Sequence, residues 1–193
     1  MNEKVKIRGK LLKVRENIPD KIRAIKNDKI TENLMKLDVF KNAEHILLYY
    51  SHNSEADTKI LIEKYVDEKY IYLPVIRGKS HFQAVPIKRP LNLRAGFLGI
   101  PEPIDTEPSS AFDDMVELVI VPGVGFDKKG NRLGMGKGYY DKYFEQYNKT
   151  IKVGLAYEEQ ILDSIPKDKY DKPVDYIVTD QNVYICNRKL FKS

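Results

Sequence analysis

The apolar run Val116-Glu-Leu-Val-Ile-Val-Pro122 is the feature that most limits how this chain can fold. A strand so rich in Val, Ile and Leu is typical of the interior of a parallel sheet that helices cover on both faces. Similar strands alternate along the chain with segments whose apolar residues recur at helical spacing. The sequence therefore predicts an α/β fold, a three-layer α/β/α single domain over residues 1–193 with a mostly parallel central sheet.

The other elements follow this alternation. Helices are predicted over residues 4–17, 20–37, 58–65 and 138–147. Strands are predicted over residues 45–51, 70–76, 82–87, 151–156, 176–179 and 183–185. Pro86 makes its strand peripheral because proline cannot donate to a full ladder, and the closing strands can pair antiparallel. Residues 90–108 are rich in Pro and Gly, and we expect an ordered loop whose apolar side chains pack against the protein.

Size and composition favour a cytoplasmic protein with a small ligand. No apolar stretch is long enough to span a membrane, the first ten residues lack a secretory signal, and the single Cys186 cannot form an internal disulfide. The net charge of +5 suits an anionic partner. Because Lys and Arg are interspersed with Asp and Glu, no stripe for a nucleic-acid backbone can be identified, so small anions are favoured over a polymer.

Glycines concentrate directly after the central strand. Six of the eleven glycines lie between Gly123 and Gly138, and residues 134–138 lead straight into a predicted helix. Backbone N–H groups there could form a concave site for phosphate oxygens, with Arg132 and Lys137 supplying positive charge. A glycine-rich turn that only lets a strand and a helix pack closely explains the spacing equally well, because neither common phosphate-binding fingerprint can be aligned.

A longer stretch of sequence around these glycines decides between a phosphate-binding site and a turn that only serves packing. The sequence PGVGFDKKGNRLGMGKGYYD, residues 122–141, resembles the signature of the 5-formyltetrahydrofolate cyclo-ligase family. Other family-like features flank it in the same order along the whole chain: Lys4 and Arg8, Tyr50 to Glu55, Gly99 to Pro103, Ala156 to Gln160, Ile165-Pro166, Asp171 and Asp175. One departure is Met135, which stands where relatives often carry a basic residue.

The resemblance implies ATP-dependent closure of 5-formyltetrahydrofolate to 5,10-methenyltetrahydrofolate, with ADP and phosphate released and ATP and Mg²⁺ as cofactors. In such proteins ATP lies against the glycine-rich loop. Arg132 and Lys137 carry the catalytic role by analogy, and the implied ATP-binding residues are Lys4, Arg8, Arg132, Leu133, Gly134, Met135, Gly136, Lys137, Gly138, Tyr139 and Tyr140. Lys4 and Arg8 share one helical face, although such a pair is more often merely solvated.

The same resemblance also implies which residues bind the folate and the metal ion. The implied folate-binding residues are Tyr50, Glu55, Met135, Gly136, Lys137, Gly138 and Tyr139, with the carboxylate of Glu55 accepting from the pterin N–H groups. Asp141 and Asp171 correspond to carboxylates around Mg²⁺, an ion that usually takes one or two of them together with phosphate. Without the resemblance, Asp141 would be interpreted as stabilising a helix N-terminus and Asp171 as a turn residue.

Other functions share these features. A sugar-phosphate isomerase would use the same glycine loop without ATP, and a nucleic-acid-binding accessory protein would use the positive charge. A non-catalytic relative would bind nucleotide without turnover. Under the family interpretation we expect a small-molecule substrate, possibly polyglutamated in its tail, no nucleic-acid partner, no membrane and a monomer.

Overall fold

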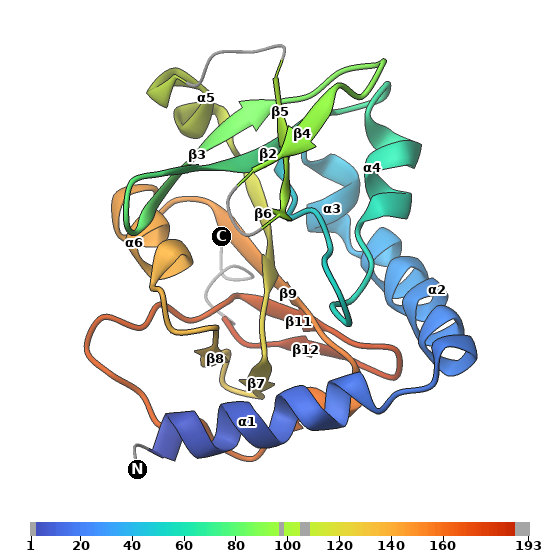
Figure 1. The fold of residues 1–193 in the computed structure, drawn as a ribbon, viewed down its shortest axis with the longest axis vertical. Coiled ribbons are helices and arrows are strands. Elements are labelled where there is room, and N and C mark those ends of the chain that lie inside the picture. The colour runs from blue at the N-terminus through green and yellow to red at the C-terminus, as the bar shows by residue number, and fades with distance from the viewer. Residues whose placement is uncertain (1–2, 97–98, 105–108, 188–193) are drawn as a thin grey trace.

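The computed structural model describes residues 3–96, 99–104 and 109–187. At its centre lies a seven-stranded sheet in the order β12-β11-β9-β6-β1-β2-β3 (Figure 1). Its strands are β1 (His45–Leu47), β2 (Tyr70–Arg77), β3 (His81–Pro86), β6 (Leu118–Pro122), β9 (Ile151–Leu155), β11 (Tyr176–Val178) and β12 (Val183–Ile185). The five inner strands are parallel, and the edge strands β3 and β12 pair antiparallel. The mostly parallel sheet is confirmed, as are the peripheral place of the strand with Pro86 and the antiparallel closing strand.

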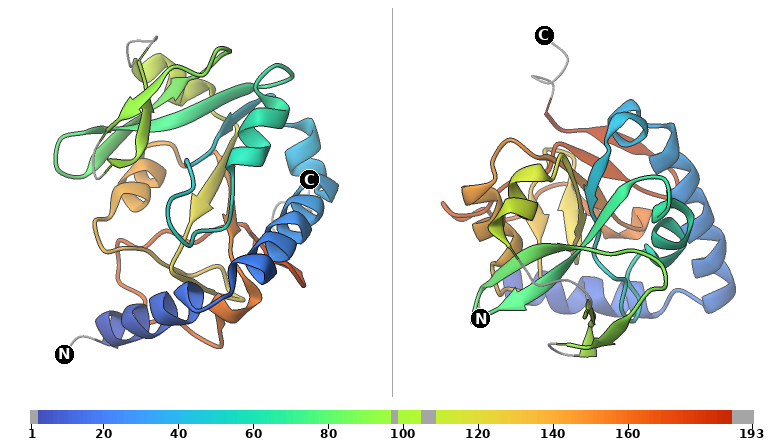
Figure 2. Two further views of the ribbon diagram at one scale, coloured as in Figure 1. Left: turned by 45° about the vertical axis from the view of Figure 1, so that its right-hand side comes forward. Right: turned by 90° about the horizontal axis from the view of Figure 1, so that it is seen from above.

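Helices cover the sheet on both faces. The six α-helices of the described residues are α1 (Glu3–Glu16), α2 (Asp20–Lys36), α3 (Asp38–Asn42), α4 (Lys59–Tyr65), α5 (Ser110–Met115) and α6 (Tyr139–Gln146). Seen from above, α2, α3 and α4 lie on one side of the sheet, and α5 and α6 lie on the other (Figure 2). The three-layer arrangement expected from the alternating pattern is therefore confirmed, with α1 running across the carboxyl ends of the parallel strands (Figure 1).

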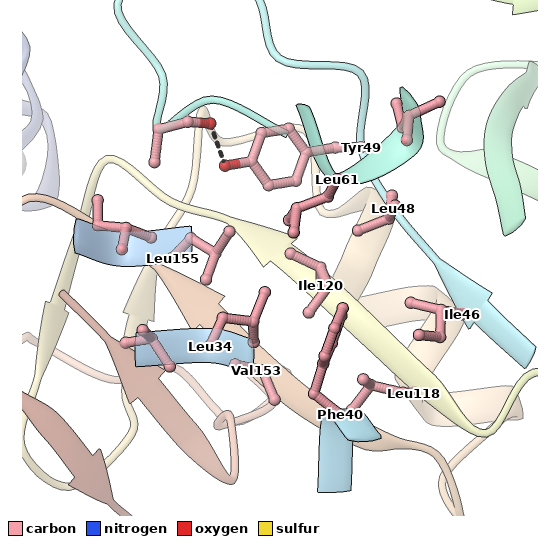
Figure 3. Close-up of a cluster of buried hydrophobic side chains, with 14 of the residues drawn as sticks. Leu34, Phe40, Ile46, Leu48, Tyr49, Leu61, Leu118, Ile120, Val153 and Leu155 are labelled. Atoms are coloured by element: carbon pink, nitrogen blue, oxygen red, sulfur yellow. Dashed lines mark hydrogen bonds between the residues drawn. The ribbon is translucent and has the colours of Figure 1, made fainter. Parts of the chain in front are cut away.

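The two faces of the sheet carry separate cores because successive strand residues point to opposite sides. Ile46 and Leu118 face a cluster that includes Leu34 of α2 and Phe40 of α3 (Figure 3). Leu47 and its neighbours on the other face pack with side chains of α5 and α6. Each fully buried aliphatic side chain contributes roughly 1.5–3 kcal/mol of transfer free energy, so these cores fix the layers.

Several short elements were not predicted. These are α3, α5, the 3-10 helix η2 (Glu158–Gln160), the hairpin of β4 (Leu93–Ala95) and β5 (Pro101–Pro103), and a small sheet of β10 (Ile161–Leu162), β7 (Gly125–Asp127) and β8 (Arg132–Leu133). Elements of two to six residues carry too little periodicity to be recognised. The small sheet is the important omission, because it forms the support for the glycine-rich loop.

The predicted loop over residues 90–108 is partly wrong. Its described part contains the β4–β5 hairpin. These strands were not predicted because proline is unfavourable in strands. Leu91 and Leu93 pack against the first core cluster, as the apolar side chains there were expected to do. Phe97 and Leu98, two further apolar residues that were expected to pack, lie outside the described residues.

Among the helices of residues 3–96, 99–104 and 109–187, none combines the length and apolar character that crossing a membrane requires.

Candidate functional site

Helix α1 closes the carboxyl edge of the sheet, where ligand sites of parallel α/β sheets lie. Its Leu11 is buried against Val124, Leu133 and Ile165, and this small cluster holds the helix across the strand ends. Lys4, Arg8 and Arg15 then reach into the protein from the same helix. The helix thus directs three cations, spaced along its length, towards this edge of the sheet.

The loop of residues 134–138 connects β8 to the first residue of α6. Gly136 and Gly138 have φ angles of 91° and 70°, in the left-handed region that glycine adopts without strain. A Cβ on Gly134 would lie 2.6 Å from Nη1 of Arg132, and one on Gly136 would lie 3.4 Å from Nη2 of Arg8. Glycine therefore lets two guanidinium groups lie directly against the loop backbone at the start of α6.

Arg132 forms the inner support of this loop. Its side chain is only 6% exposed and pairs with Asp141, Nη2 to Oδ2, at 3.0 Å. It also donates to the carbonyl of Pro122 at 3.3 Å and lies 5.4 Å from the ring centre of Tyr140. Its buried Nε has no hydrogen-bond partner in the described part of the chain. Arg132 is thus a fixed group that supports the loop from inside the protein.

The remainder of the loop is held at its base by Arg8 and is exposed at its crest, residues 135–137. Arg8 donates from Nε to the carbonyl of Gly134 at 2.8 Å, which ties α1 to the loop base. Met135 is 63% exposed, and Gly136 and Lys137 are exposed as well. The crest of the loop therefore projects a cation above two anchored guanidinium groups.

The two predicted metal carboxylates come together, although 30 residues separate them. The backbone N–H of Lys172 donates to Oδ1 of Asp141 at 3.1 Å, so the turn that carries Asp171 lies against the start of α6. Lys4 pairs with Asp168 and Asp171, both at 2.6 Å. Partial burial raises the pKa of Asp171, but hydrogen bonds from the Asp168 N–H and Lys4 outweigh it, so that pKa is lowered.

These carboxylates do not form a complete metal cage. Among the described residues, no three His, Cys, Asp or Glu side chains are grouped as metal ligands. Two carboxylates beside the glycine loop nevertheless suit Mg²⁺, which takes its other ligands from phosphate and water.

Glu55 lies in the loop between β1 and α4. Burial raises the pKa of its carboxyl group, while the His52 N–H, at 3.0 Å, and the Arg15 guanidinium oppose this rise. Burial and the Glu55 carboxylate in turn raise the pKa of Tyr140. Glu55, Arg15 and Tyr140 thus form one electrostatically coupled group beside the loop.

The structure does not place all predicted residues in this group. Tyr50 packs at the border of the first core cluster, and Lys59 lies 5.4 Å from the centre of its ring. Tyr139 packs against the second core cluster, on the α6 side. Leu133 is buried in the cluster beneath α1, so its backbone alone can reach a ligand.

Two supporting residues were missed by the sequence predictions. Buried Arg15 donates from Nε to Ser54 at 3.0 Å and from Nη1 to the carbonyl of Gly123 at 3.5 Å. Buried Gln160 donates to the carbonyls of Gly123 and Val124 at 3.0 and 2.9 Å. Arg15 follows Lys4 and Arg8 on one helical face, a spacing that could have identified it. Gln160 has no such signal beyond its place in the family-like segment 156–160.

Comparisons with known proteins agree on one family. The model of the 5-formyltetrahydrofolate cyclo-ligase family matches residues 1–180. A 5-formyltetrahydrofolate cyclo-ligase from Haemophilus influenzae is 32% identical over 173 residues, which cover 87% of this chain and 92% of that protein.

Solved structures support the same relationship. The NMR structure of Aquifex aeolicus 5,10-methenyltetrahydrofolate synthetase superposes with a TM-score of 0.86 at 35% identity, covering 95% of this chain and 93% of the other. A 5,10-methenyltetrahydrofolate synthetase from Mycoplasma pneumoniae superposes with a TM-score of 0.74, covering 93% and 99%. Its identity of 22% shows a shared fold alone.

Proposed function

The chain belongs to the 5-formyltetrahydrofolate cyclo-ligase family, and from this premise we propose how its residues perform the reaction. The enzyme converts 5-formyltetrahydrofolate to 5,10-methenyltetrahydrofolate, and the family uses ATP. The assignments of individual residues, of Mg²⁺ and of the phosphorylated intermediate are the proposal. The observation that carries them is the pair of guanidinium groups, Arg8 and Arg132, packed against a glycine loop at the start of a helix.

The reaction needs activation because an amide oxygen is a poor leaving group. In the proposed sequence the γ-phosphoryl group of ATP is transferred to the formyl oxygen of the substrate, and ADP leaves. N10 then attacks the formyl carbon, the C–O bond breaks, phosphate departs and N10 loses its proton. The protein's part is to position both substrates and to stabilise the charge on the transferring group.

The glycine loop supplies that stabilisation. Backbone N–H groups of residues 134–138 and the positive end of α6 face the phosphates. Arg132 contributes its positive charge from below the loop, and Lys137 contributes its ammonium group from the exposed crest. Arg8 and Lys4 extend the positive surface along α1 and hold the outer phosphates.

Asp141 and Asp171 are the proposed Mg²⁺ ligands. When bound, the ion would neutralise phosphate charge and orient the triphosphate. Their hydrogen bonds to Arg132, Lys4 and nearby backbone fix the carboxylates before the nucleotide arrives. The lowered pKa of Asp171 keeps it ionised, as a hard-cation ligand must be.

The folate is proposed to lie on the other side of the loop. Glu55 accepts from the pterin N–H groups, and Arg15 opposes the rise that burial causes in the pKa of that carboxyl group. Tyr140 forms the wall between the pterin and Arg132. Tyr50, held at the core border, is proposed to contribute the outer edge of the pocket.

A direct assay tests the proposal. The protein is incubated with ATP, Mg²⁺ and 5-formyltetrahydrofolate, and the absorbance of the methenyl product is followed. We expect turnover that disappears when ATP is omitted, which a sugar-phosphate isomerase would not show. Folded protein that binds Mg-nucleotide in calorimetry but gives no product would instead identify a non-catalytic relative.

We further propose that residues 1–193 form one domain, and that the protein is monomeric and cytoplasmic with no nucleic-acid partner. Sedimentation measurements test whether it is a monomer.

A further inference from the structure

Arg15, in the last turn of α1, joins two segments that leave the same edge of the sheet. The residue is buried, with 7% of its surface exposed. Its Nε donates to Oγ of Ser54 at 3.0 Å, in the loop after β1, and its Nη1 donates to the carbonyl of Gly123 at 3.5 Å, directly after β6. Because β1 and β6 are parallel neighbours, one guanidinium group can bridge the segments that follow them.

The Gly123 end of this bridge is fixed by a second side chain. Buried Gln160 donates to the carbonyls of Gly123 and Val124 at 3.0 and 2.9 Å. The Gln160 amide oxygen in turn accepts the N–H of Tyr157 at 2.9 Å. Gly123 therefore stays in place without Arg15, and it offers a fixed point against which Arg15 holds the loop after β1.

The loop between β1 and α4 is held on either side of Glu55. Ser54 and Ala56 are buried, whereas Glu55 itself is half-buried. Tyr49 donates its hydroxyl group to the carbonyl of Ala56 at 2.7 Å (Figure 3), and Arg15 binds Ser54. The position of the Glu55 carboxylate thus depends on two anchors, and Arg15 supplies the one that comes from α1.

Charge adds to this anchoring. The titratable and charged groups that face Glu55 come from several elements: Arg15, Tyr49, His52, Tyr140 and Tyr157. Burial raises the pKa of the Glu55 carboxyl group, while the His52 N–H and Arg15 lower it. Burial and the Glu55 charge raise the pKa values of Tyr49 and Tyr140, so these two hydroxyl groups stay neutral. The guanidinium group of Arg15 stays positive throughout the pH range of an enzyme assay.

We infer that Arg15 is a positioning residue for folate binding, which fixes the Glu55 loop against the end of β6 so that the carboxylate meets the pterin N–H groups. The inference rests on the proposed function. Arg15 acts through its hydrogen bond to Ser54 and its charge beside Glu55, not by touching the pterin. Its loss therefore weakens folate binding and leaves the nucleotide loop, residues 134–138, in place.

Two substitutions of Arg15 separate its charge from its hydrogen bonds. Arg15→Met keeps a long side chain in the buried site but removes the charge, and Arg15→Lys keeps the charge. We expect the KM for 5-formyltetrahydrofolate to rise about tenfold in Arg15→Met and less in Arg15→Lys, with the KM for ATP within about twofold of wild type. The folate KM should begin to rise at a higher pH in Arg15→Met than in the wild type, because the Glu55 pKa loses an opposing charge. Arg15→Lys should keep the wild-type pH profile.

Ser54→Ala tests the hydrogen bond alone. It removes the acceptor of Arg15 Nε and keeps the charge, so the folate KM should rise about two- to fivefold with a wild-type pH profile. Lys13→Met removes an exposed cation from the same helix and is the control, which should keep both KM values. Should Arg15→Met not fold, Ser54→Ala and Arg15→Lys carry the test.

Calorimetry with 5-formyltetrahydrofolate alone measures the same effects without turnover. A wild-type Kd in Ser54→Ala and in every folded Arg15 variant would overturn the inference. Equal losses for folate and ATP with an unshifted pH profile would also overturn it, because a merely structural role predicts that pattern. Turnover by the wild-type enzyme is measured separately and shows whether the proposed function holds.

Discussion

The base and the crest of the glycine loop are built differently, although they adjoin in sequence. At the base, Arg132 is 6% exposed and held by Asp141, the Pro122 carbonyl and the Tyr140 ring. At the crest, Met135 and Lys137 are exposed, and no hydrogen bond or ion pair holds Lys137 to the described residues. The base is therefore part of the folded structure, whereas the crest is available to a ligand.

This difference separates two roles that the sequence treats alike. Arg132 and Lys137 are both cations in a glycine-rich segment, and the family resemblance makes both catalytic. The structure implies that Arg132 also stabilises the fold, because it neutralises a partly buried carboxylate. Variants of the base should change stability and activity together, and variants of the crest should change activity alone.

Lys137→Ala should show the largest effect. We expect kcat to fall by about 10²–10³-fold, as for the loss of one preorganised group that stabilises the transition state. The urea midpoint should stay at the wild-type value, because an exposed crest residue contributes little to folding. Lys129→Ala, an exposed cation in the preceding turn, is the matched control for kcat. Wild-type kcat in Lys137→Ala would contradict its catalytic role.

Arg132→Ala should lower both quantities. We expect the free energy of unfolding to fall by about 3 kcal/mol, because Asp141 is left without its partner, and kcat to fall as well. Urea unfolding followed by circular dichroism measures the first effect. The double variant Arg132→Ala with Asp141→Ala should recover part of the stability, since no unpaired carboxylate remains. An unchanged unfolding midpoint in Arg132→Ala would remove the distinction between base and crest.

Glu55→Gln tests the folate side of the loop. A hydrogen bond to a charged acceptor contributes roughly 1.5–3 kcal/mol, so the KM for folate should rise by about tenfold or more. Because burial raises the pKa of Glu55, the wild-type carboxyl group takes up its proton at a higher pH than usual. The wild-type KM should therefore rise as the pH falls through that pKa, and the Gln variant should lose this dependence. A parallel pH profile for both proteins would show that Glu55 does not bind substrate in its ionised form.

Asp141→Asn should raise the Mg²⁺ concentration needed for half-maximal activity by severalfold. Arg132 and the Lys172 N–H bind different oxygens of the carboxylate, so the amide oxygen can still accept from one of them, and stability should change less than in Arg132→Ala. Titration of activity with Mg²⁺ at fixed ATP measures the shift. The control is Asp163→Asn, which changes an exposed carboxylate in the segment before Asp171. An identical Mg²⁺ titration for both variants would exclude Asp141 as a ligand.

Asp113→Asn should give the smallest effect and should act on stability. Burial raises the pKa of Asp113 from 3.8 to about 6, so the folded state holds the proton more tightly than the unfolded state. The wild type therefore gains stability as the pH falls from about 6 towards 4 and lacks that gain at pH 8. We expect the Asn variant to be more stable at pH 8 by about 1 kcal/mol, with the gap closing near pH 4. Urea midpoints at both pH values measure it, and a gap that stays constant would contradict the pKa shift.

Long elements were predicted well because their patterns are local. The run Val116–Pro122 supplied the central strand β6, and the spacing of apolar residues supplied α1, α2 and α6. The shared helical face of Lys4 and Arg8 also holds, since both reach partners beneath the helix. The small sheet under the loop could not be predicted. Its strands depend on buried Asp127, which accepts the N–H groups of Asn131 and Ile165, and the latter partner is remote in sequence.

The sequence by itself determined the layers of this protein and the family to which its loop belongs, because apolar periodicity and a long contiguous motif are properties of neighbouring residues. The tertiary structure alone decided which charges became anchors and which stayed exposed. Burial depends on segments that come into contact only after folding. Lys4 forms an ion pair with Asp171, and the backbone N–H of Lys172 donates to Asp141. No local sequence pattern predicts these contacts, because the free energy that stabilises them comes from long-range packing and desolvation.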